Sequence, residues 1–119
     1  MPQYLLLLRD QPSEWAKLSP AEMQDVIMRY MHWRNQIAGQ GFQPGGQKLA
    51  DNPGHFLARH GSAATLAHVD GPFAEAKELV SGYFTIHAPD YDAALAVART
   101  CPHLQYGSIE VREIERLDG

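Results

Sequence analysis

Cysteine is nearly absent from this chain of 119 residues, since Cys101 is the only one. No internal disulfide can form, which fits a reducing cytosol. Clusters of lysine and arginine are missing too, and the formal net charge is −4, so neither nucleic-acid binding nor a basic membrane-surface helix is expected. The apolar run at residues 4–8 is too short for a signal peptide or a membrane span. We expect one cytoplasmic domain covering residues 1–119.

The motifs of several enzyme classes are also missing. The chain has no GxSxG, P-loop or GxGxxG, so hydrolase, NTPase and dinucleotide-binding functions have no support. Its six histidines include no HExxH, and the five-residue spacing of His55 and His60 puts them on opposite faces of a strand. His68 and His103 are isolated in the sequence. We therefore expect no metal and no cofactor.

Helix signals are present in two places. Ser19, Pro20 and Glu22 form a capping box with proline at the first helical position, and Gly39 is a plausible stop. Asp90 is the expected N-cap of a second helix that ends before Pro102. The apolar stripe of the first helix comprises Met23, Val26, Ile27, Tyr30, Trp33 and Ile37; that of the second comprises Tyr91, Ala94, Leu95, Ala98 and Cys101.

Strand signals fill the remaining segments. The continuous apolar run at 4–9 indicates a central strand buried on both faces, and residues 79–87 and 108–114 alternate with period two. A short strand at 47–50 and a hairpin at 56–60 and 63–69 are weaker predictions. The order predicts an α+β fold, a ferredoxin-like β-α-β-β-α-β frame with an added hairpin.

One face of the strand at 79–87 is expected to pack against another part of the protein or a second copy. Tyr83, Thr85 and His87 share this face, which is too apolar for water and too polar for an ordinary core. Two sheets that pair across a two-fold axis would bury it. We therefore expect a homodimer, in which this face lines a cavity or the interface.

Residues 70–78 are the most unusual stretch of the chain. Gly71 and Pro72 predict a turn. Asp70 is a candidate acid–base group or ligand anchor, or else its side chain caps that turn. Glu75 and Lys77 are candidates for binding a polar ligand, or else belong to a solvated helical turn.

Two further residues are candidates for acid–base chemistry. His87 is able to move protons near neutral pH, or else forms a hydrogen bond at the dimer interface. Tyr30, on the core stripe, is either a pocket residue or a packed aromatic with a satisfied hydroxyl.

These motifs together resemble the DGPF subgroup of the YCII-related proteins. The matching pieces are residues 70–75 with Lys77-Glu78, Gly82-Tyr83-Phe84, residues 90–94, Cys101-Pro102 and residues 107–112. The resemblance implies a dimeric α/β barrel of ferredoxin-like subunits, and some members resemble partners or neighbours of sigma factors in gene organisation. Ala76 replaces the usual threonine of the loop. The position of the histidine in the His-Asp dyad proposed for related proteins is Tyr30, not His32, so that dyad does not carry over.

Two functional hypotheses follow. The first is a small enzyme with acid–base chemistry by Tyr30, Asp70 or His87, in a pocket bordered by the loop at 70–78, with Glu75, Lys77 and Tyr83 as ligand-binding residues. The second is a non-catalytic module that binds an unknown small molecule and acts with a sigma factor. Convergent ionisable groups within hydrogen-bond reach would favour the enzyme.

Overall fold

The computed structural model describes residues 1–51, 54–59, 66–70 and 79–117. Four strands form an antiparallel sheet in the order β2-β5-β1-β6, and two further strands form a separate pair, β3-β4. The strands are β1 Gln3–Asp10, β2 Gly45–Lys48, β3 His55–Arg59, β4 Leu66–Asp70, β5 Leu79–His87 and β6 Gly107–Ile114. The helices are α1 Pro12–Ala16, α2 Pro20–Gly39 and α3 Tyr91–Ala98, followed by the 3₁₀ turn η1 Pro102–Gln105.

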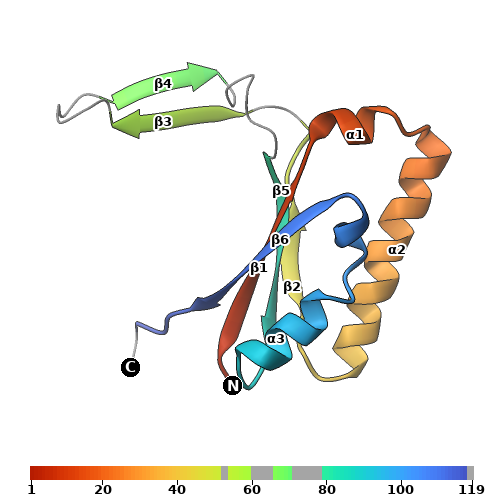
Figure 1. Cartoon of the computed structure of the whole chain (residues 1–119), viewed down its shortest axis with the longest axis vertical. Coiled ribbons are helices and arrows are strands. Elements are labelled where there is room, and N and C mark those ends of the chain that lie inside the picture. Colours follow the sequence, from red (N-terminus) through yellow and green to blue (C-terminus); the bar gives the residue numbers. More distant parts are fainter. Residues whose placement is uncertain (52–53, 60–65, 71–78, 118–119) are drawn as a thin grey trace.

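The helices lie on one face of the four-stranded sheet, and the β3-β4 pair projects beyond its end (Figure 1). The predicted α+β class is thus confirmed, and β1 occupies the predicted central place between β5 and β6. Strand bounds differ by a few residues from those predicted; Asp70, expected to open a loop, is the last residue of β4. In the part of the chain that the structure describes, no helix is both long and apolar enough to cross a membrane.

The start of α2 follows directly from its sequence. The Ser19 side chain accepts a hydrogen bond from the Glu22 N–H at 3.1 Å, and the Glu22 carboxylate accepts one from the Ser19 N–H at 3.0 Å. These bonds satisfy two amide groups that a helix N-terminus leaves without partners. They also lower the pKa of Glu22. The helix therefore begins at a fixed residue, which fixes the faces presented by its later turns.

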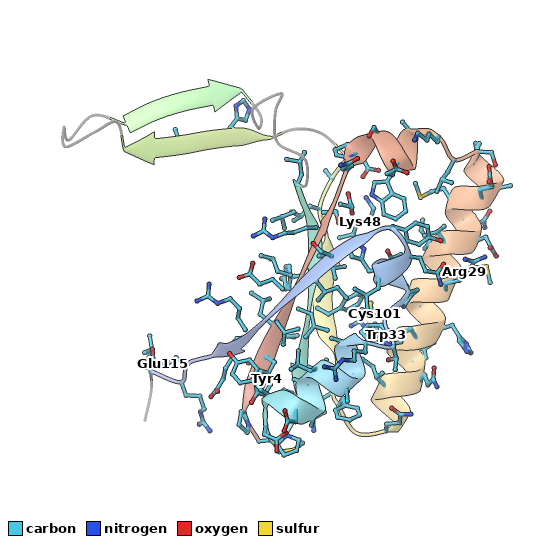
Figure 2. The ribbon with its side chains drawn as sticks, viewed as in Figure 1. Tyr4, Arg29, Trp33, Lys48, Cys101 and Glu115 are labelled. Carbon is cyan, nitrogen blue, oxygen red and sulfur yellow. The ribbon has the colours of Figure 1, made fainter. Side chains whose placement is uncertain are left out.

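The core lies between the helices and one face of the sheet. Its buried side chains are Tyr4, Leu6, Trp33, Ile37, Ile86, Ala88, Ala94, Val97, Ala98 and Cys101. Figure 2 shows Trp33 and Cys101 in this layer. Burial raises the pKa of the Cys101 thiol to about 11, so Cys101 is a packing residue at neutral pH. It lies beyond α3, which ends at Ala98 and not just before Pro102 as predicted.

Burial of β1 alternates, which corrects the prediction that both of its faces are buried. Tyr4, Leu6, Leu8 and Asp10 are buried toward the helices, whereas the intervening residues are only partly buried. Among the described elements, no helix covers that second face (Figure 1).

Candidate functional site

A pocket of about 230 Å³ lies between α2 and the adjoining strands β2 and β5. Its walls are mainly apolar, and they include Leu8 from β1, Phe84 from β5, and Met23, Val26, Ile27 and Met31 from α2. Trp15 of α1 contributes at one end. Concave, largely apolar pockets with a few polar groups are the usual form of small-molecule sites.

Two glycines line the sheet side of this pocket and allow β2 and β5 to approach closely. Gly46 of β2 is paired with Phe84, and Gly82 of β5 is paired with Leu8, so both face α2. Gly46 has a φ of +138°, and a Cβ there would lie 2.1 Å from the Tyr83 carbonyl oxygen. A Cβ on Gly82 would lie 2.9 Å from the Gln47 carbonyl oxygen. Any side chain at Gly46 would thus break the close approach of β2 to β5.

Tyr30 and His103 meet at this pocket, which both of them line. The Tyr30 hydroxyl lies 2.8 Å from His103 Nδ1, and His103 Nε2 lies 2.8 Å from the carbonyl oxygen of Arg9. Because a carbonyl oxygen only accepts, Nε2 carries the hydrogen in this geometry. In the neutral ring Nδ1 is then an acceptor, and the Tyr30 hydroxyl donates to it.

Asp10 is the third residue of a cluster with Tyr30 and His103, and its carboxylate lies near Nε2 of His103. It ends β1 on the buried side, where it is 2% exposed and His103 is 1% exposed. Asp10 Oδ2 lies 3.9 Å from His103 Nε2, beyond hydrogen-bond reach, and within the described residues it has no hydrogen-bond partner. A buried carboxylate oxygen in this state is costly unless a positive charge forms beside it. The position is therefore suited to stabilising a protonated His103.

Burial, with smaller contributions from Cys101 and Asp10, raises the pKa of the Tyr30 phenol far above its ordinary value. A free phenolate is consequently not formed near neutral pH. The protonated hydroxyl lies at hydrogen-bond distance from His103, and both residues line the pocket.

The rim of the pocket carries three charged side chains. Lys48 donates to Asp51 at 2.7 Å and to the Leu49 carbonyl at 3.1 Å, so these two charges offset each other. Arg34, one turn beyond Tyr30 on α2, lines the pocket and contacts the Pro44 carbonyl at 3.5 Å. Among the described residues of the rim, one net positive charge therefore remains, that of Arg34.

Comparison with known proteins assigns the chain to a family. A family model for the YCII-related domain matches residues 2–118, almost the entire chain. The chain belongs to the YCII-related family. A search of the curated proteins finds no match.

In this YCII-related chain, three of the six predicted site residues have described side chains, namely Tyr30, Tyr83 and His87, and Tyr30 and His87 lie apart. Tyr30 lines the pocket. His87 pairs with Gln3 on the face away from the helices and lines a separate hollow with Met1 and Ile114, so it does not approach Tyr30. Tyr83 is among the residues at the pocket, but its register opposite Leu7 directs its side chain to the uncovered face.

The remaining predicted residues belong to the segment at 70–78. Asp70 ends β4, paired with His55, and its side chain lies outside the described part. Glu75 and Lys77 also lie outside the described residues. Their ligand-binding role stays a prediction.

Asp10 and His103 were missed by sequence reasoning. Asp10 has the parity of Tyr4, Leu6 and Leu8, so alternation alone would have placed its carboxylate on the buried face. His103 is isolated from other histidines in the sequence, but in the fold it is hydrogen-bonded to Tyr30. No metal-binding cluster of three or more His, Cys, Asp or Glu side chains is found among the described residues.

Proposed function

We propose that this protein is an enzyme that binds a small, largely apolar molecule in the pocket beside α2 and moves a proton through Tyr30 and His103. The observation that carries the proposal is the 2.8 Å hydrogen bond between the Tyr30 hydroxyl and His103 Nδ1, in a pocket with otherwise mainly apolar walls. Ionisable groups at hydrogen-bond distance in such a pocket are the arrangement that proton transfer requires.

The proposed step is a relay. An acidic hydrogen of the bound molecule passes to the Tyr30 oxygen while the phenolic hydrogen passes to His103 Nδ1. Tyr30 ends neutral, the molecule carries one negative charge, and His103 becomes an imidazolium. Asp10, 3.9 Å from Nε2, stabilises that cation. Return of the proton to a different atom of the molecule would complete an isomerisation, and return to the same atom would exchange hydrogen with solvent.

Tyr30→Phe is the variant that tests the relay. Ligands are first found by thermal shift with a panel of small apolar molecules that carry an exchangeable C–H. With such a ligand, we expect the wild-type protein to catalyse deuterium incorporation from heavy water, measured by mass spectrometry. Tyr30→Phe should slow this exchange by about 10²–10⁴-fold, because the ring remains and only the hydroxyl is lost.

The matched control is Tyr91→Phe. The Tyr91 hydroxyl accepts a hydrogen bond from the Glu113 N–H at 2.7 Å, and Tyr91 is not among the pocket residues. This variant should retain the full exchange rate. Equal rates in Tyr30→Phe and the wild type would contradict the relay, and binding without any exchange would leave the non-catalytic binding module as the function.

We also propose that the four-stranded sheet is that of a ferredoxin-like subunit, and that two copies pair through the uncovered face. In support, the strand order β2-β5-β1-β6 becomes the β-α-β-β-α-β arrangement once the inserted β3-β4 pair is set aside. Leu5, Leu7 and Tyr83 are partly buried apolar residues on a face without helices. Assignment to the DGPF subgroup rests on the sequence of residues 70–78.

Light scattering should give twice the chain mass of 13.3 kDa. Leu7→Glu should yield a monomer, because Leu7 lies in the middle strand, and the new carboxylate would lie beside Glu110 in the interface. Met28→Glu is the control, since Met28 is 62% exposed on α2. A wild-type monomer at micromolar concentration would overturn the pairing.

A further inference from the structure

We propose that the pocket is selective for a small apolar carboxylic acid, whose carboxylate binds Arg34 and whose body fills the space between α2 and the sheet. This inference rests on the proposed function, because it names the class of molecule that the same pocket accepts. Three observations carry it: the apolar walls, the charge of Arg34, which has no carboxylate partner among the described residues, and the position of that charge relative to Tyr30.

The apolar walls of the pocket favour a ligand with an apolar body. Met23, Ile27 and Met31 succeed one another at four-residue spacing, so they form a row along one side of α2. Ile27 is 42% exposed and Met31 is 59% exposed, which are high values for side chains of this kind. A bound apolar body would remove their surface from water, and the flexible methionines adapt to its shape.

The positive charge of Arg34 at the rim favours a ligand that carries an anionic group. Arg9, Arg29 and Arg112 each have a carboxylate oxygen between 2.9 and 3.7 Å from a guanidinium nitrogen. Arg34 has none in the part of the chain that the structure describes, and its contact with the Pro44 carbonyl is long, at 3.5 Å. Most of its five N–H donors are therefore available to a ligand. A planar carboxylate matches the guanidinium fork, and an ammonium group would be repelled.

The size and spacing of the site restrict the ligand further. Arg34 follows Tyr30 by one helical turn, roughly 6 Å along the axis of α2. A carboxylate on Arg34 would therefore place a nearby carbon or oxygen of the same molecule within reach of the Tyr30 hydroxyl. The volume of about 230 Å³ lies below the roughly 300–1,000 Å³ of sites for drug-sized ligands. The fitting class is an acid with one aryl group or a branched aliphatic group.

Three probes that share one aromatic body test this selectivity. Indole-3-acetate is the acid, indole-3-acetamide is its neutral counterpart, and tryptamine is the related cation. By isothermal titration calorimetry we expect the acid to bind the wild-type protein at least about tenfold more tightly than the amide, and tryptamine to bind most weakly.

Arg34→Gln should reduce the preference for the acid to less than about twofold and leave the affinity for the amide unchanged. Arg99→Gln is the control, because Arg99 is exposed at the end of α3 and does not line the pocket; it should keep the full preference. Equal affinities of acid and amide in the wild type, a preference that survives Arg34→Gln, or no saturable binding of the acid at millimolar concentration would each overturn the proposal.

The outcome is separable from that of the relay. Tyr30→Phe retains Arg34, so it should keep the preference for the acid even though proton exchange is lost. If the wild type prefers the acid but no bound acid exchanges hydrogen, the relay fails and the selectivity stands. If exchange occurs equally in acids and amides of equal affinity, the relay stands and the selectivity fails.

Discussion

His103→Ala is expected to lower the free energy of unfolding by about 3–5 kcal/mol, measured by urea denaturation followed by circular dichroism. The side chain is 1% exposed, and both of its ring nitrogens have partners at 2.8 Å. Its removal leaves the Tyr30 hydroxyl and the Arg9 carbonyl without these bonds, and it leaves the buried Asp10 carboxylate without its imidazole neighbour. Each lost partner has a desolvation cost, and the vacated ring volume adds a cavity.

His32→Ala provides the matched control. His32 lies on the exposed side of α2, and its replacement should change the free energy of unfolding by no more than about 0.5 kcal/mol. A loss in His103→Ala as small as that in His32→Ala would refute the description of His103 as a buried hydrogen-bonded residue.

Asp10→Asn separates stability from chemistry in this cluster. It removes the charge from a carboxylate whose Oδ2 has no hydrogen-bond partner among the described residues, so its cost to folding should be small. The same change removes the stabilisation of a protonated His103. A double-mutant cycle of Asp10→Asn with His103→Ala would measure the coupling between the two residues directly. A folded Asp10→Asn variant with slow exchange would show that Asp10 is retained for the relay rather than for the fold.

The elements with local signals could be predicted from the sequence, whereas of the cluster at the pocket only Tyr30 could. Ser19 and Glu22 are three residues apart and cap α2 as predicted. The alternation in β5 placed Phe84 and Ile86 toward the core and His87 on the opposite face. In these cases the information lies within one turn or one strand, where spacing determines which side chains share a face.

The cluster around His103 depends on contacts between distant segments. Tyr30 and His103 are 73 positions apart, and His103 and Arg9 are 94 apart. Their meeting depends on the antiparallel register of β6 with β1, where Gly107 lies opposite Asp10, and on the short turn η1 that precedes β6. The register between strands cannot be read from a single sequence. The helical stripe was therefore enough to identify Tyr30, but nothing in the sequence connected it with His103.

A pocket with Tyr30 was predicted, but most of the other residues that line the pocket beside α2 were not identified from the sequence. This pocket requires β2 to pair with β5 so that Gly46 lies opposite Phe84, and β1 to pair with β5 so that Leu8 lies opposite Gly82. The prediction had concentrated on residues 70–78, where unusual residues are dense in sequence. Gly46 and Gly82 do not stand out in the sequence in this way, because they matter through the side chain that they lack.

Trp33→Ala is expected to lower the free energy of unfolding by about 3–5 kcal/mol, a large share of the roughly 5–15 kcal/mol that a domain possesses. Trp33 is 4% exposed, its indole N–H donates to the Thr100 hydroxyl at 2.8 Å, and its ring makes an edge contact with Phe84 at 5.1 Å. It therefore joins α2 both to the segment after α3 and to the sheet.

Loss of the Trp33 side chain should also disrupt the pocket. Trp33 lies between Tyr30 and Arg34 on α2, so loosening the helix from Phe84 separates the two walls of the pocket. We expect Trp33→Ala to lose ligand-induced thermal stabilisation as well as intrinsic stability, whereas Trp33→Phe should lose mainly the hydrogen bond to Thr100, about 1 kcal/mol. Trp15→Ala is the control for intrinsic stability alone, because Trp15 also lines the pocket. Trp15 is partly exposed and packs on Tyr106, so its replacement should destabilise the fold less. Equal destabilisation by Trp15→Ala and Trp33→Ala would contradict the role of Trp33 as the residue that holds α2, and with it Tyr30 and Arg34, against the sheet.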